Sequence, residues 1–213
     1  MSSNTLLQVA TAVAKDVGLS VPTIVAAATD ASDRAMVEMK QVLDFTGEEI
    51  ARRVDWSFLR TTTVIAGTGV ASAFALPAAC QRLIAGAAVT VGGIPLRGGL
   101  SGEEFLSLAA VAGTTRFYLT GGTPGTMTIQ FWPTLANATN ATVYYQSANW
   151  NGTASAATYV ADSDIALIPD QLMIKGGIAR WRRQKGMDYQ DYASEFEMAL
   201  QNYAMFDDNA RSP

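Results

Sequence analysis

Pairs of carboxylates are the residues of this sequence whose types and spacing could most readily support chemistry. Such pairs occur at Glu48-Glu49, at Glu103-Glu104, and at Asp162 with Asp164. Glycoside hydrolysis uses an acid and a base that face each other across a sugar, and adjacency in the sequence does not provide this arrangement. We therefore interpret the three pairs as solvated charges on helices or turns.

The sequence contains no histidine. This excludes the usual Ser-His-Asp and Cys-His nucleophile systems, HExxH zinc sites and the most common general base near neutral pH. Cys80 is the single cysteine, so an intramolecular disulfide and a multi-cysteine metal site are excluded, and we expect a small buried side chain. The Asp162–Asp164 motif is too short for a helix–loop–helix calcium site. We predict a protein that is not an enzyme, with no catalytic residues, cofactor or metal.

Two further motifs could bind a ligand. Residues 121–126 are rich in glycine but run from strand to strand without a Lys-Ser/Thr ending, so we interpret them as a turn and not as a phosphate-binding loop. Residues 180–185, Arg-Trp-Arg-Arg-Gln-Lys, form the one basic cluster with an aromatic residue, and they could contact nucleic acid. We favour a helix C-terminus whose cations complement the helix dipole while Trp181 packs inward. We interpret Trp56 and Phe58 as core residues between helix and sheet layers.

Composition limits the class of protein. The 213 residues carry a net charge of −4, which argues against an electrostatic binder of nucleic acid. Hydrophobic residues make up 49% and charged residues 16%, which indicates a subunit that buries surface against copies of itself. No apolar run reaches the roughly 18 residues of a membrane span. The first 19 residues lack a basic region before their apolar residues, so we expect an amphipathic helix and not a signal peptide.

Helical periodicity predicts four longer helices that would position these groups. The first covers residues 5–17 and ends before Gly18. The second has Thr29 or Asp30 as its N-cap and runs to about residue 54, with apolar residues on one face at Ala35, Met39, Val42, Leu43, Ile50 and Val54. The third follows Pro169 and ends in the basic cluster, and the fourth begins after Asp188 as N-cap. Residues 206–213 are predicted to be a flexible tail.

The middle of the chain has the pattern of short β-strands bounded by Gly and Pro. Strands are expected at 61–65, 73–77, 88–91, 116–120, 127–132 and 142–147, with a capping box at Ser101–Glu104 starting a short helix to about Ala110. Residues 149–158 are predicted to be a mobile loop. The fold class expected is α+β, with a helical bundle formed by the N- and C-terminal helices and an inserted small antiparallel β-sheet or sandwich domain. The expected domains are residues 1–60 with 165–205 (helical), 61–160 (β) and 206–213 (tail).

A series of motifs occurs in a recognisable order along nearly the whole chain. They are Val17-Gly18-Leu19, Asp55-Trp56-Ser57-Phe58-Leu59-Arg60-Thr61-Thr62, Leu76-Pro77, Arg82-Leu83-Ile84, Pro95-Leu96-Arg97-Gly98 and the helix junction at 180–189. This layout resembles the head-to-tail adaptor (connector) proteins of tailed bacteriophages and gene-transfer agents. The Gly- and Ala-rich loops at 66–73 and 151–157 depart from the pattern.

The resemblance implies a structural ring subunit, commonly dodecameric, between the portal protein and a tail nozzle or neck (stopper) protein. DNA would pass through its channel without sequence-specific binding, the location would be the neck of the virion after synthesis in the host cytoplasm, and no membrane would be involved. Candidate residues for contacts to another subunit or to the portal are Arg52, Arg53, Trp56, Arg180, Arg182, Arg183, Lys185, Phe206, Asp207, Asp208 and Arg211.

Two other functions remain open from the sequence. The first is another neck or tail-completion protein of the virion, which would have a similar plan. The second is a carbohydrate-binding tail module, in which aromatic side chains would stack on sugars. The aromatic residues considered for that platform are Trp132, Tyr144, Tyr145 and Trp150.

Overall fold

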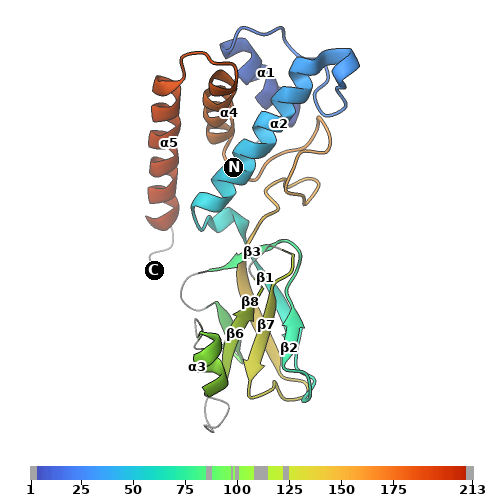
Figure 1. Cartoon of the computed structure of the whole chain (residues 1–213), viewed down its shortest axis with the longest axis vertical. Helices are drawn as coiled ribbons and strands as arrows, with labels where there is room; N and C mark the ends of the chain where they lie inside the picture. The colour runs from blue at the N-terminus through green and yellow to red at the C-terminus, as the bar shows by residue number, and fades with distance from the viewer. Residues whose placement is uncertain are drawn as a thin grey trace. The chain divides into compact units, whose positions relative to one another are not determined.

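The computed structural model describes residues 4–84, 88–96, 98, 101–107, 115–121 and 125–209. The chain forms two compact units (Figure 1). Met1–Leu59 and Ala148–Pro213 make up the helical unit, and Arg60–Ser147 make up the β unit. Within the described residues there are five α-helices and two antiparallel sheets, which confirms the predicted α+β class.

The helical unit contains α1 (Leu6–Asp16), α2 (Asp30–Arg53), α4 (Asp170–Gln184) and α5 (Gln190–Asn209). Local sequence sets where the first two begin, because both have a capping box at the N-terminus. In α1, Gln8 N–H donates to Thr5 Oγ1 over 3.4 Å and Thr5 N–H donates to Gln8 Oε1 over 2.9 Å. Thr29 is the N-cap of α2, one of the two residues predicted for that role.

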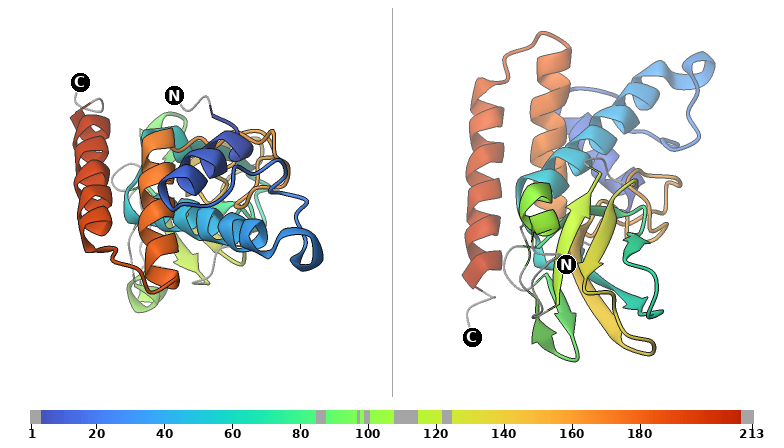
Figure 2. Two further views of the ribbon diagram at one scale, coloured as in Figure 1. Left: turned by 90° about the horizontal axis from the view of Figure 1, so that it is seen from above. Right: turned by 60° about the horizontal axis from the view of Figure 1, so that its bottom comes forward.

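Two adjacent glycines allow α4 to lie in the middle of the helical unit, in contact with α1, α2 and α5 (Figure 2). A Cβ atom on Gly176 would lie 2.5 Å from Thr46 Cγ2 and 2.9 Å from Phe196 Cε2. A Cβ atom on Gly177 would lie 2.9 Å from Leu43 Cδ2. These distances are shorter than van der Waals contact, so the absence of a side chain at both positions lets α2 and α5 approach the backbone of α4.

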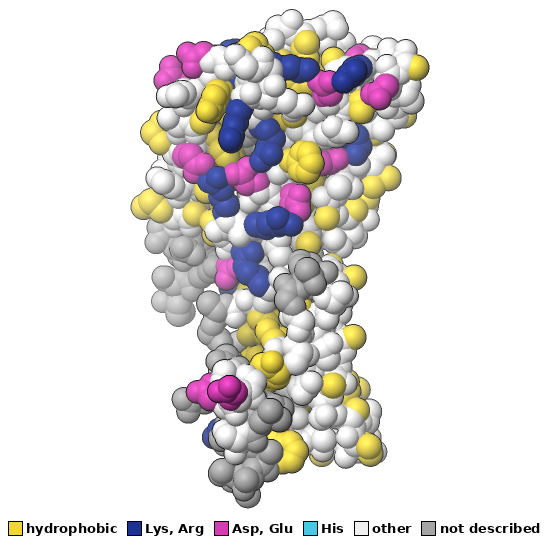
Figure 3. Space-filling view, viewed as in Figure 1, with side chains coloured by type: hydrophobic (Ala, Val, Ile, Leu, Met, Phe, Trp, Pro, Cys, Tyr) yellow, Lys and Arg dark blue, Asp and Glu magenta, His cyan; other side chains and the backbone are white. Residues whose placement is uncertain are grey.

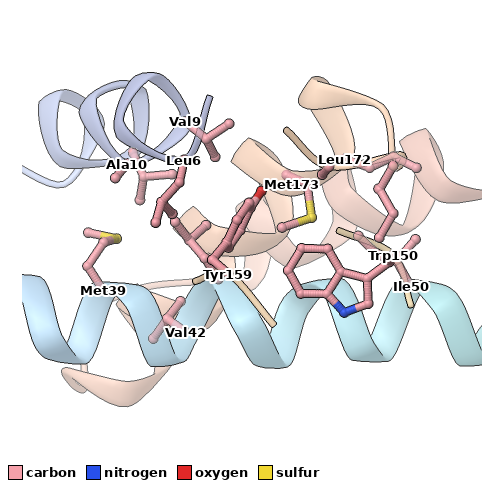
Figure 4. Close-up of a cluster of buried hydrophobic side chains, with 14 of the residues drawn as sticks. Leu6, Val9, Ala10, Met39, Val42, Ile50, Trp150, Tyr159, Leu172 and Met173 are labelled. Carbon is pink, nitrogen blue, oxygen red and sulfur yellow. The ribbon is translucent and has the colours of Figure 1, made fainter. Parts of the chain in front are cut away.

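The segment between the β unit and α4 contributes to the helical core although it contains no helix or long strand. Trp150 and Tyr159 are buried beside Ile50, Val42 and Met173 (Figure 4). Their rings meet edge to face, with centroids 4.8 Å apart and an interplanar angle of 82°. The predicted loop at 149–158 is therefore anchored in the core by Trp150 near its start and by Tyr159 directly after its end.

Asn151 and Asp164 fix the backbone of this segment from inside. Asp164 is 2% exposed, and its Oδ2 atom accepts hydrogen bonds from the Asn151 amide (2.7 Å), Val160 N–H (2.6 Å) and Ala161 N–H (2.9 Å). Burial alone would raise the pKa of Asp164, but these three hydrogen bonds lower it below its usual value. The other end of the Asn151 side chain accepts from Thr153 N–H. A buried charge is thus fully bonded and holds the turns in place.

The strands of the β unit form two sheets. They are β1 (Arg60–Ala66), β2 (Ala73–Ala75), β3 (Cys80–Leu83), β4 (Val89–Val91), β5 (Ile94–Pro95), β6 (Arg116–Thr120), β7 (Thr128–Trp132) and β8 (Asn140–Ser147). The first sheet has the order β1-β8-β4-β5, with β3 also paired to β8, and the second has the order β2-β7-β6. Short helix α3 (Gly102–Ser107) begins with the predicted capping box between Ser101 and Glu104. The end predicted for it at Ala110 lies outside the described residues.

Most strands predicted from the sequence for this unit are present and pair antiparallel, as expected. The predicted hairpin is confirmed by the pairing of β6 with β7, in which Phe117 lies opposite Phe131. Cys80 is fully buried, as expected, and burial raises the pKa of its thiol to about 11. Three features differ from the prediction: β2 ends at Ala75, and Cys80–Leu83 (β3) and Ile94–Pro95 (β5) form strands that were not expected.

The tail predicted at 206–213 is wrong for residues 206–209, because α5 continues to Asn209. The carboxylate of Asp207 accepts hydrogen bonds from the backbone N–H (2.8 Å) and the hydroxyl of Ser57. This contact joins the last turn of α5 to the turn after α2 and supports the additional helical residues. Residues 210–213 of the predicted tail lie outside the described residues.

We expect Gly47→Ala to destabilise the protein. A Cβ atom there would lie 2.5 Å from Trp150 Cε2, and the buried ring cannot move aside without disturbing its neighbours. The overpacking should outweigh the helix propensity of alanine and lower the free energy of unfolding by about 1–3 kcal/mol. Chemical denaturation measures this change. Gln41→Ala on the exposed side of α2 is the control, and an equal effect of both substitutions would contradict the expectation.

We expect Asp164 to make stability depend on acid pH. Its pKa is lower in the folded chain than in the unfolded chain, so its contribution is complete above about pH 4 and is lost as the pH falls through the folded-state pKa. Asp164→Asn should lower the free energy of unfolding by about 1–3 kcal/mol at pH 7, and by less at pH 3. Denaturation at pH 7, 5 and 3 tests this. Exposed Asp191→Asn is the control, and a constant difference from wild type at all three pH values would refute the expectation.

Candidate functional site

Three of the candidate arginines of α2 and α4 converge on one groove of the helical unit. Arg53 lies in the last turn of α2, and Arg180 and Arg183 lie near the end of α4. With α5 completing its wall, the groove has a volume of about 700 Å³. We call it the α2–α4–α5 groove. In Figure 3, Lys, Arg, Asp and Glu side chains intermingle over the helical unit.

Glu49 is the charged centre of this groove. One carboxylate oxygen accepts a hydrogen bond from Arg53 and the other accepts one from Arg180. Arg53 also donates to both oxygens of Glu197 on α5, at 2.6 and 2.7 Å. The hydrogen bond to Glu197 raises the pKa of Arg53 against the opposing effect of burial. The arginines therefore connect α2 to α4 and α5 by a chain of charge-assisted hydrogen bonds.

Arg182 and Lys185 bind within the unit and do not line the groove. The guanidinium of Arg182 lies 4.0 Å from the Tyr192 ring centroid and 3.5 Å from Asp16 Oδ1. Lys185 forms an ion pair with Glu38, and the hydrogen bonds from Lys185 and Arg34 lower the pKa of Glu38. Trp181 is 2% exposed, which confirms its predicted inward packing. These two cations secure the end of α4 to α1, α2 and α5.

Phe45 and Arg183 are the side chains of the groove that remain most open. Phe45 is 55% exposed, and its ring centroid lies 5.9 Å from the Arg180 guanidinium. Arg183 is exposed and lies 6.0 Å from the Tyr189 ring centroid, and no described acidic side chain is within ion-pair distance of it. The sequence had suggested Arg183 but not Phe45, because an aromatic residue on a long helix is normally taken as core.

The other candidate residues lie apart from the groove. Trp56 is fully buried, donates to Ile50 C=O over 2.7 Å and stacks on Phe58, so a partner could not reach it in this structure. Arg52 pairs with Glu48 on the surface of α2. Phe206 is 75% exposed on α5, whereas Asp207 binds Ser57. The side chain of Asp208 and all of Arg211 lie outside the described residues.

A second exposed surface runs along α5. Met198, Met205 and Phe206 are 58%, 64% and 75% exposed. Beside them is a hollow of about 520 Å³ between α4 and α5, lined also by Lys175 and Glu195. Large apolar side chains exposed together on one helix are typical of a protein interaction surface. We call Met198, Met205 and Phe206 the α5 apolar face.

The aromatic residues considered for sugar binding do not form one platform. Trp150 is fully buried in the core of the helical unit, and Tyr145 is 6% exposed in the β unit. Trp132, on β7, and Tyr144, on β8, are both half-buried and belong to different sheets of the β unit. A stacking platform needs exposed ring faces, so the structure removes Trp150 and Tyr145 from that role.

The described residues contain neither a cluster of metal-binding side chains nor a helix suited to span a membrane. No group of three or more Cys, Asp and Glu side chains lies close enough together to hold a metal ion among them. No helix in this part of the chain has both the length and the apolar character needed to cross a membrane.

Comparison with known proteins gives one family. The family model described as SU10 adaptor protein matches residues 4–212. No curated protein matches the sequence. The matched range includes both units, the α2–α4–α5 groove and the α5 apolar face.

We expect Glu49→Gln to weaken the connection between α2, α4 and α5. The groups involved are about one-third exposed, so solvent screens the two ion pairs and the free energy of unfolding should fall by only about 1 kcal/mol. The loss should shrink in 1 M NaCl, because salt screens the wild-type pairs. Denaturation at low and high salt measures both effects. Glu48→Gln is the control, since Glu48 has a single, more exposed partner, and an equal loss in both variants would contradict the role of Glu49.

Proposed function

The chain belongs to the SU10 adaptor protein family, and from this premise we propose that it is a structural head-to-tail adaptor subunit. Copies would form a ring, with twelve members as the expected number, between the portal protein and the tail. DNA would pass through the centre of the ring. The observation that carries the proposal is the family match, which spans residues 4–212 and so includes both units.

The match also confirms the resemblance to phage head-to-tail adaptors, which rested on the order of short motifs. It supports a phage adaptor protein that acts in the virion and binds other virion components. The portal on one side and a nozzle or neck protein on the other are the partners we propose. We further propose that the role is mechanical and not enzymatic.

The charge of the chain suits a ring through which DNA must slide. The net charge is −4, so the subunit as a whole repels phosphate and does not release the counterions that drive nonspecific DNA binding. Among the described arginines of the helical unit, all except Arg183 form ion pairs with carboxylates: Glu49 and Glu197 bind Arg53, and Glu49 also binds Arg180. Such pairing lowers the local positive potential that would otherwise retain DNA.

The helical unit is also built in a way that suits assembly. Its helices are fixed to one another by close packing at Gly176 and Gly177 and by the ion pairs around Glu49. A rigid surface loses little conformational entropy when it binds a partner. The groove and the α5 apolar face are therefore suited to contacts between proteins.

The proposal is tested by mixing the purified chain with the portal protein encoded in the same genome. Native mass measurement and negative-stain imaging should show a closed ring bound coaxially to the portal, because contacts to the partner offset the entropy lost in assembly. The ring should not retard duplex DNA at physiological salt. A chain that remains monomeric and ignores the portal would refute the adaptor proposal.

A further inference from the structure

We propose that the α2–α4–α5 groove receives the α5 apolar face of a second copy of this chain. The inference rests on the proposed function, because it assigns the contact by which neighbouring subunits of a ring would join. Beyond the proposed function, the inference states which two surfaces meet, which copy provides each surface, and why the surfaces are chemically complementary.

The two surfaces lie on different sides of α5, as a ring requires. Residues Ala193, Phe196 and Glu197 line the groove, whereas Met198, Met205 and Phe206 form the apolar face. At 3.6 residues per turn these two sets point in roughly opposite directions around the helix. A head-to-tail contact joins two different patches and can close into a ring, whereas a contact of one patch with itself stops at a dimer. One chain can therefore offer its groove to one neighbour and its apolar face to the other.

Both surfaces expose large apolar side chains that could pack against each other. The groove exposes Phe45 to 55%, and the apolar face exposes Phe206 to 75% with two methionines beside it. Methionine side chains adapt to irregular surfaces, and aromatic residues supply most of the binding energy at many interfaces. Covering these side chains removes from water the large apolar groups that the isolated helical unit leaves exposed on α2 and α5.

Charge favours the same pairing and fixes which copy supplies which surface. The groove is lined by Arg53, Arg180 and Arg183 against Glu49 and Glu197, so its arginines exceed its carboxylates. Within the described residues, Arg183 has no acidic partner in its own chain. Helix α5 has no basic residue. Of its acidic residues, Glu197 binds Arg53 and Glu195 pairs with Lys175, whereas Asp207 and Asp208 directly follow Phe206 of the apolar face. An incoming α5 would bring negative charge to the open Arg183, and such complementarity orients the encounter.

The test uses two variants that each damage one surface. Phe45→Glu places a negative charge in the groove, where it should repel the acidic α5, and Phe206→Asn replaces the exposed ring of the apolar face with an uncharged amide. Both positions are exposed, so both variants should fold, which circular dichroism and thermal unfolding verify. Val70→Glu, at an 86% exposed apolar residue of the β unit, is the matched control. The readout is the mass distribution of each chain mixed with the portal protein, compared with wild type.

Each variant alone should form at least tenfold less closed ring than wild type, and the Val70→Glu control should form rings normally. An equimolar mixture of Phe45→Glu and Phe206→Asn should give pairs of about twice the 22.6 kDa chain mass, because one intact groove can then bind one intact apolar face. Normal rings from either variant, or no pairs in the mixture, would overturn the inference while the adaptor function stands. Absence of rings from wild type would refute the proposed function itself.

Discussion

The close contact of α4 with its neighbours is the interaction on which the helical unit depends. At Gly176 and Gly177 the α4 backbone lies against Thr46, Phe196 and Leu43, at distances that leave no room for a Cβ atom. Helices that approach so closely gain extensive dispersion contact, and their relative positions are set by shape. Because α2, α4 and α5 together form the groove, this packing also determines the geometry of the candidate interface.

Hydrogen bonds and ion pairs of two carboxylates, Asp164 and Glu49, hold further parts of the helical unit together. Asp164 binds the turns that carry Trp150 and Tyr159 into the core, while Glu49 binds the arginines that join α2 to α4. The two carboxylates differ in exposure, and therefore in how much stability is lost when each is removed. Asp164 is 2% exposed and binds the amide of fully buried Asn151, so losing it removes a hydrogen bond in a place that water does not reach. Glu49 is partly exposed, and water can replace much of what its ion pairs provide.

The sequence predicted the features of this fold that depend on local interactions. Thr29 as N-cap and the hairpin of β6 and β7 follow from residues close to one another along the chain. Features set by distant partners were missed. Residues 149–158 have the composition of a mobile loop, yet Trp150 lies against a helix residue, Gly47, about a hundred positions earlier. Strand β3 was missed because its hydrogen bonds are made to β8, more than sixty residues later, and a register shift after Cys80 interrupts the pattern.

The same distinction explains which interface residues could be found. Arg53, Arg180 and Arg183 were suggested by charge in helix ends, but only the folded unit shows that Glu49 engages two of them and leaves Arg183 open. Trp56 was interpreted from the sequence as a core residue and was also a candidate for contacts to a partner, and its burial agrees with the first interpretation. Phe45 and Met198 were not suggested, because periodicity shows that an apolar residue belongs to a helix face and not whether that face is covered. An exposed apolar group on a charge-poor subunit is best explained by a partner that covers it, and in the proposed ring a second copy of the chain would be that partner.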